Sequence, residues 1–296
     1  MEAAKPAPES KLRKSLIGKP TVEYFEKIKA VGFEGIETQA WNVSEEVAKA
    51  GRAAADQTDM RIHSVMRGWA NFNNPEKLQA DIESVELALR SAAIYGADAI
   101  LLVPCRTGGM AMPQPWDFDI TFDEKTCLVS KVVQGDNSEY AAYIEAQNYA
   151  TEVSTKAIEA LIPVAEENGV IIAIENVWNN LWVTPKLLSA FVRKFDNPWV
   201  QTYYDVGNHC KYAMPPAWFE ELSDTVAKVH IKDFANDREA NNGGRFVNIR
   251  EGDVDWPGVK KSLDAINYDG WLTIEGSGGL GHEELSRRLD LIIAGN

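Results

Sequence analysis

Four polar side chains follow apolar runs of the sequence, and their types suit one divalent metal ion. Glu175, Asp205, His230 and Glu275 each stand at or near the end of such a run. Three carboxylates and one imidazole form a hard, oxygen-rich ligand set, for which Mn²⁺ is the first choice and Mg²⁺, Co²⁺ or Zn²⁺ are alternatives. Taken singly, an acidic residue after a strand often only meets solvent, and a lone histidine is often a hydrogen-bonded core residue. The prediction of a metal site therefore rests on the four residues together.

The elements that must position these residues alternate between short apolar runs and longer amphipathic segments. About 250 residues suffice for a barrel of eight strand–helix units, and the chain has 296. The alternation continues to the end without a linker-like break, which predicts one α/β domain, a single (β/α)₈ TIM barrel. A long helix is expected to begin at Pro75. Eight segments are expected as strands: residues 14–17, 35–39, 61–65, 99–103, 170–174, 200–204, 226–231 and 271–275.

The four candidate ligands belong to the ends of the last four predicted strands. In a barrel of this kind, functional groups project from the carboxyl ends of the strands. Neighbouring strands lie about 5 Å apart, so residues at their ends can reach one point. We therefore expect the four side chains to converge at one rim.

Two segments lie outside this minimal barrel. Residues 1–12 are rich in small residues and proline and are predicted to be a flexible lead, so the barrel domain is expected to span residues 13–296. The lead has no hydrophobic region, and the expected location is cytoplasmic, or periplasmic if a signal peptide was removed before Glu2. Residues from about 104 to 138 show no clear periodicity and are interpreted as a long insertion. Because it follows a strand, the insertion is expected on the active-site face, as a lid or as a subunit contact in a homo-oligomer.

Composition and charge argue against several partners. The formal net charge is −14, whereas proteins that grip nucleic-acid phosphates usually present a basic face. No apolar run of about 20 residues occurs, so a membrane span is not expected. The three cysteines, Cys105, Cys127 and Cys210, form no CxxC pair, and their odd number favours a reducing compartment.

Six short motifs accompany the predicted strands: residues 32–37 (GFEGIE), 174–178 (IENVW), 204–208 (YDVGN), 229–233 (VHIKD), 251–255 (EGDVD) and 274–275 (IE). Together they resemble the xylose isomerase-like barrel superfamily of sugar isomerases and epimerases. The resemblance runs from about Lys14 to the end and is densest in the second half. The last four motifs follow the same order as in L-ribulose-5-phosphate 3-epimerases.

This resemblance implies a metal-dependent isomerase or epimerase of a keto-sugar or sugar phosphate. Glu175, Asp205, His230 and Glu275 would be the metal ligands, and the two glutamates would be the catalytic acid/base pair on opposite faces of the substrate. A proton next to the carbonyl becomes removable through a metal-stabilised enediolate. The chain also departs from the pattern, because many free-sugar epimerases carry a histidine where this sequence has Asn208.

Contacts to the small-molecule carbohydrate substrate are predicted from residues near the strand ends. Lys232 follows His230 by two positions and is expected to point into the same rim. Aromatic faces commonly pack against the apolar side of sugars, which favours Trp178. The glycine turn at 276–279 either binds phosphate through backbone N–H groups or only connects a strand to a helix. The candidate substrate-binding residues are Lys232, Asn208, His209, Trp178, His63 and Arg245.

Three other functions stay open at this point. A lyase or hydratase acting on a keto-sugar or keto-glycoside would begin with the same proton abstraction and use the same four residues. A phosphodiesterase of the endonuclease IV type needs many histidines for three metal ions, and this chain has four. A non-catalytic sugar-binding protein would have no need to retain all four metal-site residues.

Overall fold

Eight parallel strands close into a barrel in the computed structural model, which describes residues 11–240, 242–276 and 278–296. The strands are β1 (Arg13–Ile17), β2 (Gly35–Thr38), β3 (Arg61–Trp69), β4 (Ala99–Val103), β7 (Ile171–Glu175), β8 (Val200–Asp205), β9 (Val226–Ile231) and β12 (Trp271–Ile274). Their order around the barrel is β1–β12–β9–β8–β7–β4–β3–β2. The predicted (β/α)₈ barrel is thereby confirmed. Of the predicted lead at residues 1–12, residues 1–10 lie outside the described part of the chain.

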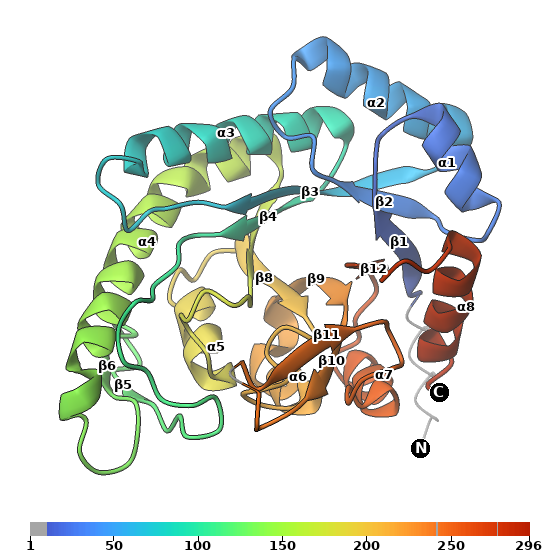
Figure 1. Ribbon diagram of the computed structural model, residues 1–296. Coiled ribbons are helices and arrows are strands. Elements are labelled where there is room, and N and C mark those ends of the chain that lie inside the picture. Colours follow the sequence, from blue (N-terminus) through green and yellow to red (C-terminus); the bar gives the residue numbers. More distant parts are fainter. Residues whose placement is uncertain (1–10, 241, 277) are drawn as a thin grey trace, which may run out of the picture.

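A helix follows each barrel strand and lies on the outside of the barrel (Figure 1). Thr21 and Ser44 cap the first two helices, because their side-chain oxygens accept the N–H groups of Tyr24 and Val47. No helix in the described ranges is long and apolar enough to cross a membrane. The helices are α1 (Val22–Lys29), α2 (Glu45–Thr58), α3 (Leu78–Tyr95), α4 (Ala141–Asn168), α5 (Pro185–Arg193), α6 (Pro215–Leu222), α7 (Trp256–Ala265) and α8 (His282–Ile293), with 3₁₀ turns at Ser138–Tyr140 and Ser223–Thr225.

The helix expected from Pro75 begins about one turn later, at Leu78. The carbonyl of Asn74 accepts the N–H groups of both Lys77 and Leu78, and its side chain accepts that of Glu76. These bonds hold the residues around Pro75 in a turn, so the proline precedes the helix and does not open it.

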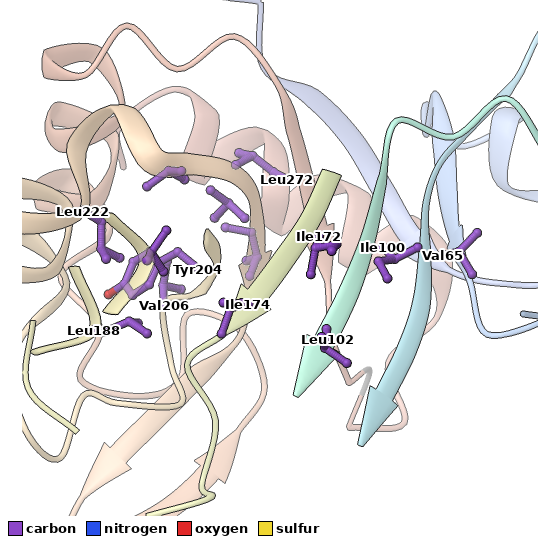
Figure 2. Close-up of a cluster of buried hydrophobic side chains, with 14 of the residues drawn as sticks. Val65, Ile100, Leu102, Ile172, Ile174, Leu188, Tyr204, Val206, Leu222 and Leu272 are labelled. Atoms are coloured by element: carbon purple, nitrogen blue, oxygen red, sulfur yellow. The ribbon is translucent and has the colours of Figure 1, made fainter. Parts of the chain in front are cut away.

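Barrel residues alternate between an outer face under the helices and the barrel interior. Ile100, Ile172 and Ile174 belong to the main core between the strands and the helices (Figure 2). The interior is filled on the side of β4, β7 and β8 by a separate small cluster, which contains Leu101, Val103, Ala173 and Tyr203. The ends of β7 and β8 therefore have apolar support on both faces.

The insertion predicted at 104–138 contains a short hairpin that its sequence did not reveal. Asn148 of α4 bonds to both the N–H and the carbonyl of Val129, which holds the hairpin against α4. Before the hairpin in the same insertion, the ring of Trp116 lies 5.4 Å from the guanidinium of Arg238. Strands this short leave no periodic pattern, and the predicted roles as lid or subunit contact stay predictions. The hairpin strands are β5 (Thr121–Phe122) and β6 (Val129–Lys131).

A second hairpin directly follows β9 and is anchored by Asp233. This buried carboxylate accepts the N–H groups of Phe234 at 2.8 Å and Gly252 at 3.0 Å, and also the indole N–H of Trp256. A Cβ at Gly252 would lie 2.3 Å from the Asp233 carboxylate, so this turn needs glycine. The hairpin and the turn at 251–255 are thus fixed to each other. The hairpin strands are β10 (Asp233–Asn236) and β11 (Gly244–Val247).

We expect Ile172→Ala to lower the free energy of unfolding by about 2–5 kcal/mol, because removal of a buried side chain leaves a cavity. Ile172 is fully buried, whereas Val47 on α2 is 51% exposed. Urea unfolding followed by circular dichroism measures both variants, and Val47→Ala should change stability by less than about 0.5 kcal/mol. Equal effects of the two substitutions would contradict the assigned core.

Candidate metal centre

The four residues at the strand ends meet in one place. Ligand-type atoms of Glu175, Asp205, His230 and Glu275 all lie within 4.8 Å of one another. Nδ1 of His230 is 3.4 Å from a Glu175 oxygen, 3.9 Å from Asp205 Oδ2 and 3.7 Å from a Glu275 oxygen. The convergence expected from the strand ends is present, and the group can hold a metal ion.

Two atoms of this group are buried without a hydrogen-bond partner in the described ranges: Asp205 Oδ2 and His230 Nδ1. Buried polar atoms are nearly always paired, so unpaired atoms call for an explanation. Both atoms face the gap between the four side chains, at 3.9 Å from each other. A cation bound there would satisfy both, which is the fit expected of a metal site.

The charges of the group also call for a cation. Burial raises the pKa of Asp205 and of Glu175, and Glu275 raises both further. Burial opposes ionisation of Glu275 as well, but His230 and Lys232 outweigh it and lower the pKa of Glu275 to about 2. Two of the three carboxylates are therefore hard to ionise until positive charge is added. A divalent ion would supply that charge.

The end of β8 presents Asp205 in one orientation. Its Oδ1 accepts the backbone N–H groups of Gly207 at 2.8 Å and Asn208 at 2.7 Å. Asn176 exchanges two hydrogen bonds with the Asp205 backbone, at 2.7 and 2.8 Å, and so joins the ends of β7 and β8. A Cβ at Gly207 would lie 2.7 Å from the Lys232 carbonyl, so the turn requires glycine. These contacts leave Oδ2 directed at the centre.

Glu37, at the end of β2, holds His230 from across the barrel. Its Oε2 lies 2.7 Å from His230 Nε2, and its Oε1 accepts the hydroxyl of Ser64 at 2.8 Å. Because a carboxylate accepts hydrogen bonds, Nε2 carries a proton, and Nδ1 is the atom that faces the centre. Glu37 and Glu175 raise the pKa of His230 although burial lowers it, so a bound metal ion would displace a proton from Nδ1. Glu37 is not among the predicted site residues. In the sequence it stands inside the predicted strand 35–39, so it did not carry the strand-end signal of Glu175.

Lys232 and Asn208 link the two glutamates, and the structure brings both into the centre. The Lys232 ammonium lies 2.6 Å from Glu275 Oε2 and 3.2 Å from Asn208 Oδ1. The Asn208 amide in turn donates to the Asn176 carbonyl at 3.0 Å and lies 3.5 Å from Glu175 Oε1. Asn208 thus takes a defined place between Lys232 and Glu175.

Trp178 forms part of a wall beside the centre, whereas Arg245 does not. The indole N–H of Trp178 donates to the Asn208 carbonyl, and its ring lies 4.8 Å from that of Phe246. The Lys232 ammonium sits 4.5 Å from the Phe246 ring. Arg245 precedes Phe246 on β11 and is exposed. Since side chains alternate along a strand, it points away from this wall.

The structure does not bring His63 or His209 to the centre. His63 lies in the barrel interior, where its Nε2 meets the hydroxyls of Ser15 at 2.9 Å and Thr273 at 3.0 Å. The predicted strand ended at residue 65, but β3 runs on to Trp69, so His63 stands near the start of the strand. His209 is buried behind the rim with Nε2 at 2.9 Å from the Val177 carbonyl, and burial lowers its pKa to about 3.

A cavity of ≈ 360 Å³ opens beside Glu275. This volume falls at the lower end of the range of small-molecule sites, roughly 300–1,000 Å³. Through Lys232 and Glu275, the cavity adjoins the centre on the side of the second hairpin. Its lining consists of Lys232, Phe246, Val247, Asn248, Glu251, Glu275, Gly276 and Gly278.

Comparison with known proteins identifies the family to which this barrel belongs. A family model described as xylose isomerase-like TIM barrel matches residues 25–290. The chain belongs to the xylose isomerase-like TIM barrel family. No curated protein sequence matches it.

Solved structures of this fold superpose on nearly the whole chain. A D-tagatose 3-epimerase-like protein is 18% identical with a TM-score of 0.69, covering 95% of this chain and 98% of its own. The 3-keto-D-glucoside 4-epimerase from E. coli is 15% identical with a TM-score of 0.68, covering 97% and 100%. Mannonate dehydratase from Streptococcus suis is 16% identical with a TM-score of 0.66, covering 97% and 95%. At these identities the likeness concerns the fold alone.

Replacing Glu37 by Gln should weaken metal binding about 10–100-fold, because the amide does not fix the proton on His230 Nε2 as a carboxylate does. Isothermal titration calorimetry with Mn²⁺ measures the change. Glu26→Gln, at an exposed position on α1, serves as the matched control and should leave the affinity unchanged. An unaltered affinity in the Glu37 variant would show that this carboxylate does not act through His230.

Metal affinity should fall as the pH is lowered from about 8 to about 5, because protons compete with the metal for its ligands. Asp205 and Glu175 have raised pKa values in the metal-free protein, since burial and Glu275 disfavour their ionised forms. They therefore take up protons at a higher pH than ordinary carboxylates. Electron paramagnetic resonance of free Mn²⁺ gives the affinity at each pH, and a constant value over this range would contradict a site built on these two residues.

Proposed function

We propose that this protein is a metal-dependent isomerase or epimerase of a keto-sugar or its phosphate. The observation that carries the proposal is the pair of glutamates in one buried centre. Glu175 enters from β7 and Glu275 from the end of β12, with β8 and β9 between them. Proton removal from a carbon next to a carbonyl, and proton return, each need a positioned acid or base. The epimerases among the similar structures support this choice of reaction.

The two glutamates have different electrostatic surroundings in the metal-free protein. Lys232 and His230 keep Glu275 ionised, with its pKa lowered to about 2 although burial opposes this. Burial and Glu275 raise the pKa of Glu175. Pairs of titratable groups whose environments separate their pKa values are typical of acid/base catalysis. We propose that one glutamate removes the proton and the other returns it, with the roles exchanged in the reverse direction.

The proposed cofactor is one divalent ion, with Mn²⁺ as the first choice, held by Glu175, Asp205, His230 and Glu275. When bound, it would supply positive charge for the negative charge that develops next to the carbonyl. Lys232 and Asn208 lie at hydrogen-bond distance from each other, and both are proposed to hold substrate oxygens. Trp178 and Phe246 would exclude water from one side of the centre.

Two alternative functions, a lyase and a nuclease, differ in how well the centre supports them. A lyase acting on a keto-glycoside would use the same glutamates, and its products distinguish it. A nuclease of the endonuclease IV type is disfavoured, because of the four histidines only His230 reaches the centre. His63 and His209 are buried elsewhere, and His282 begins α8. The chain does not offer the histidines that a three-metal cluster would need.

The decisive experiment is deuterium exchange. Mn²⁺-loaded protein is incubated in D₂O with a panel of ketoses, ketose phosphates and keto-glycosides, and the substrates are analysed by NMR. We expect deuterium next to the carbonyl of at least one member. Glu275→Gln should lower the exchange rate by at least about 100-fold, because an amide cannot move the proton, whereas Glu26→Gln should retain it.

The labelled product identifies the reaction. An epimer or an aldose–ketose pair identifies an epimerase or an isomerase, and an unsaturated product without an epimer identifies a lyase. Absence of exchange with every member of the panel, or full activity of the Glu275 variant, would reject the proposed function.

A further inference from the structure

We propose that the cavity beside Glu275 binds the neutral, hydroxyl-bearing substituent of a sugar glycoside and not a phosphate group. This inference rests on the proposed function, because it names the substrate class of the same site. The cavity begins at Lys232 and Glu275 and extends outward past Phe246 to Glu251. A sugar whose reacting carbon lies at the centre would therefore direct a substituent into it.

The charges along the cavity disfavour a phosphate. Among the described lining residues, Lys232 is the cation, and Glu275 and Glu251 are the acids. The Lys232 ammonium is already within 2.6 Å of Glu275 and 4.0 Å of Asp205. Glu251 is ionised, since hydrogen bonds from Arg288 and Asn248 lower its pKa. A phosphate dianion in this cavity would approach two carboxylates and gain no free cation.

The charged residues on neighbouring elements do not make the cavity favourable for a phosphate either. Arg288 pairs with Glu251 at 2.7 Å and with Glu284 at 2.7 Å, so its charge is shared by two carboxylates. The first turn of α8 carries Glu283 and Glu284, whereas a phosphate at a helix N-terminus gains most without acidic neighbours. A divalent ion at the centre would meet three carboxylates and leave no excess of positive charge. Gly276 and Gly278 are accordingly assigned to shaping the cavity.

The same lining suits a neutral sugar substituent. Phe246 is 39% exposed, and its ring is backed by Trp178 at 4.8 Å and by Phe234 at 5.3 Å. An exposed aromatic face held in this way can pack against the C–H surface of a sugar or an aglycone. The carboxylates of Glu251 and Glu275 accept hydrogen bonds from hydroxyl groups. The same cavity is thus lined by an aromatic ring and by carboxylates that accept hydrogen bonds.

Binding of defined probes to the Mg²⁺-loaded protein tests the inference. The probes are phenyl and methyl glycosides of glucose and galactose in both anomers, glucose 6-phosphate and inorganic phosphate, each titrated by NMR. We expect at least one phenyl glycoside to bind about tenfold more tightly than glucose 6-phosphate. Phe246→Ala should remove that advantage. The matched control is Tyr149→Ala, which removes an aromatic side chain of similar exposure, 43%, on α4 and should have no effect.

Tighter binding of glucose 6-phosphate or of inorganic phosphate, failure of every phenyl glycoside to bind, or equal behaviour of the two alanine variants would overturn the inference. These outcomes are separate from the test of function. Deuterium exchange with a ketose or ketose phosphate alone would keep the proposed function and reject the glycoside subsite. Tight glycoside binding without exchange in any panel member would keep the glycoside subsite and reject the proposed function.

Discussion

The burial of three carboxylates beside one imidazole is the constraint on which the centre depends. Each carboxylate loses hydration in the barrel mouth, and their mutual repulsion disfavours ionisation further. Lys232 offsets the charge of Glu275 through a contact of 2.6 Å, while Glu37 adds another acidic group behind His230. The remaining negative charge makes a divalent cation the natural counterpart of the group. The unpaired atoms Asp205 Oδ2 and His230 Nδ1 lie where such an ion would bind.

The barrel interior is divided in a way that supports this centre. On one side, Leu101, Val103, Ala173 and Tyr203 form an apolar filling beneath Glu175 and Asp205. On the other, the interior contains polar groups that bond to one another: Ser15, Glu37, His63, Ser64 and Thr273. The apolar side fixes the strand ends by packing, and the polar side allows a buried carboxylate to reach His230. Both kinds of support leave the ligands with little freedom, as a preorganised site requires.

The substrate side of the site depends on a different set of contacts. Asp233 joins the second hairpin to the turn at 251–255 through backbone N–H groups, and this places Phe246 and Glu251 on the same cavity. Contacts that hold part of a lining in place before a ligand binds reduce the conformational entropy lost on binding. The acid/base chemistry and the selection of substituents are thus built from neighbouring but separate elements.

The sequence by itself determined the barrel and the convergence of its four candidate ligands, because strand periodicity and the position of Glu175, Asp205, His230 and Glu275 at successive strand ends are local properties. Only the tertiary structure decided what lies opposite those residues. Glu37 reaches His230 across 193 positions of sequence, and barrel closure sets that contact. Likewise, the true length of β3 placed His63 deep in the interior, since periodicity tells which face a residue takes but not at which depth it lies. The hairpin in the insertion was hidden for a related reason: its two strands are too short to carry a pattern of their own, and β6 is held by contacts with α4.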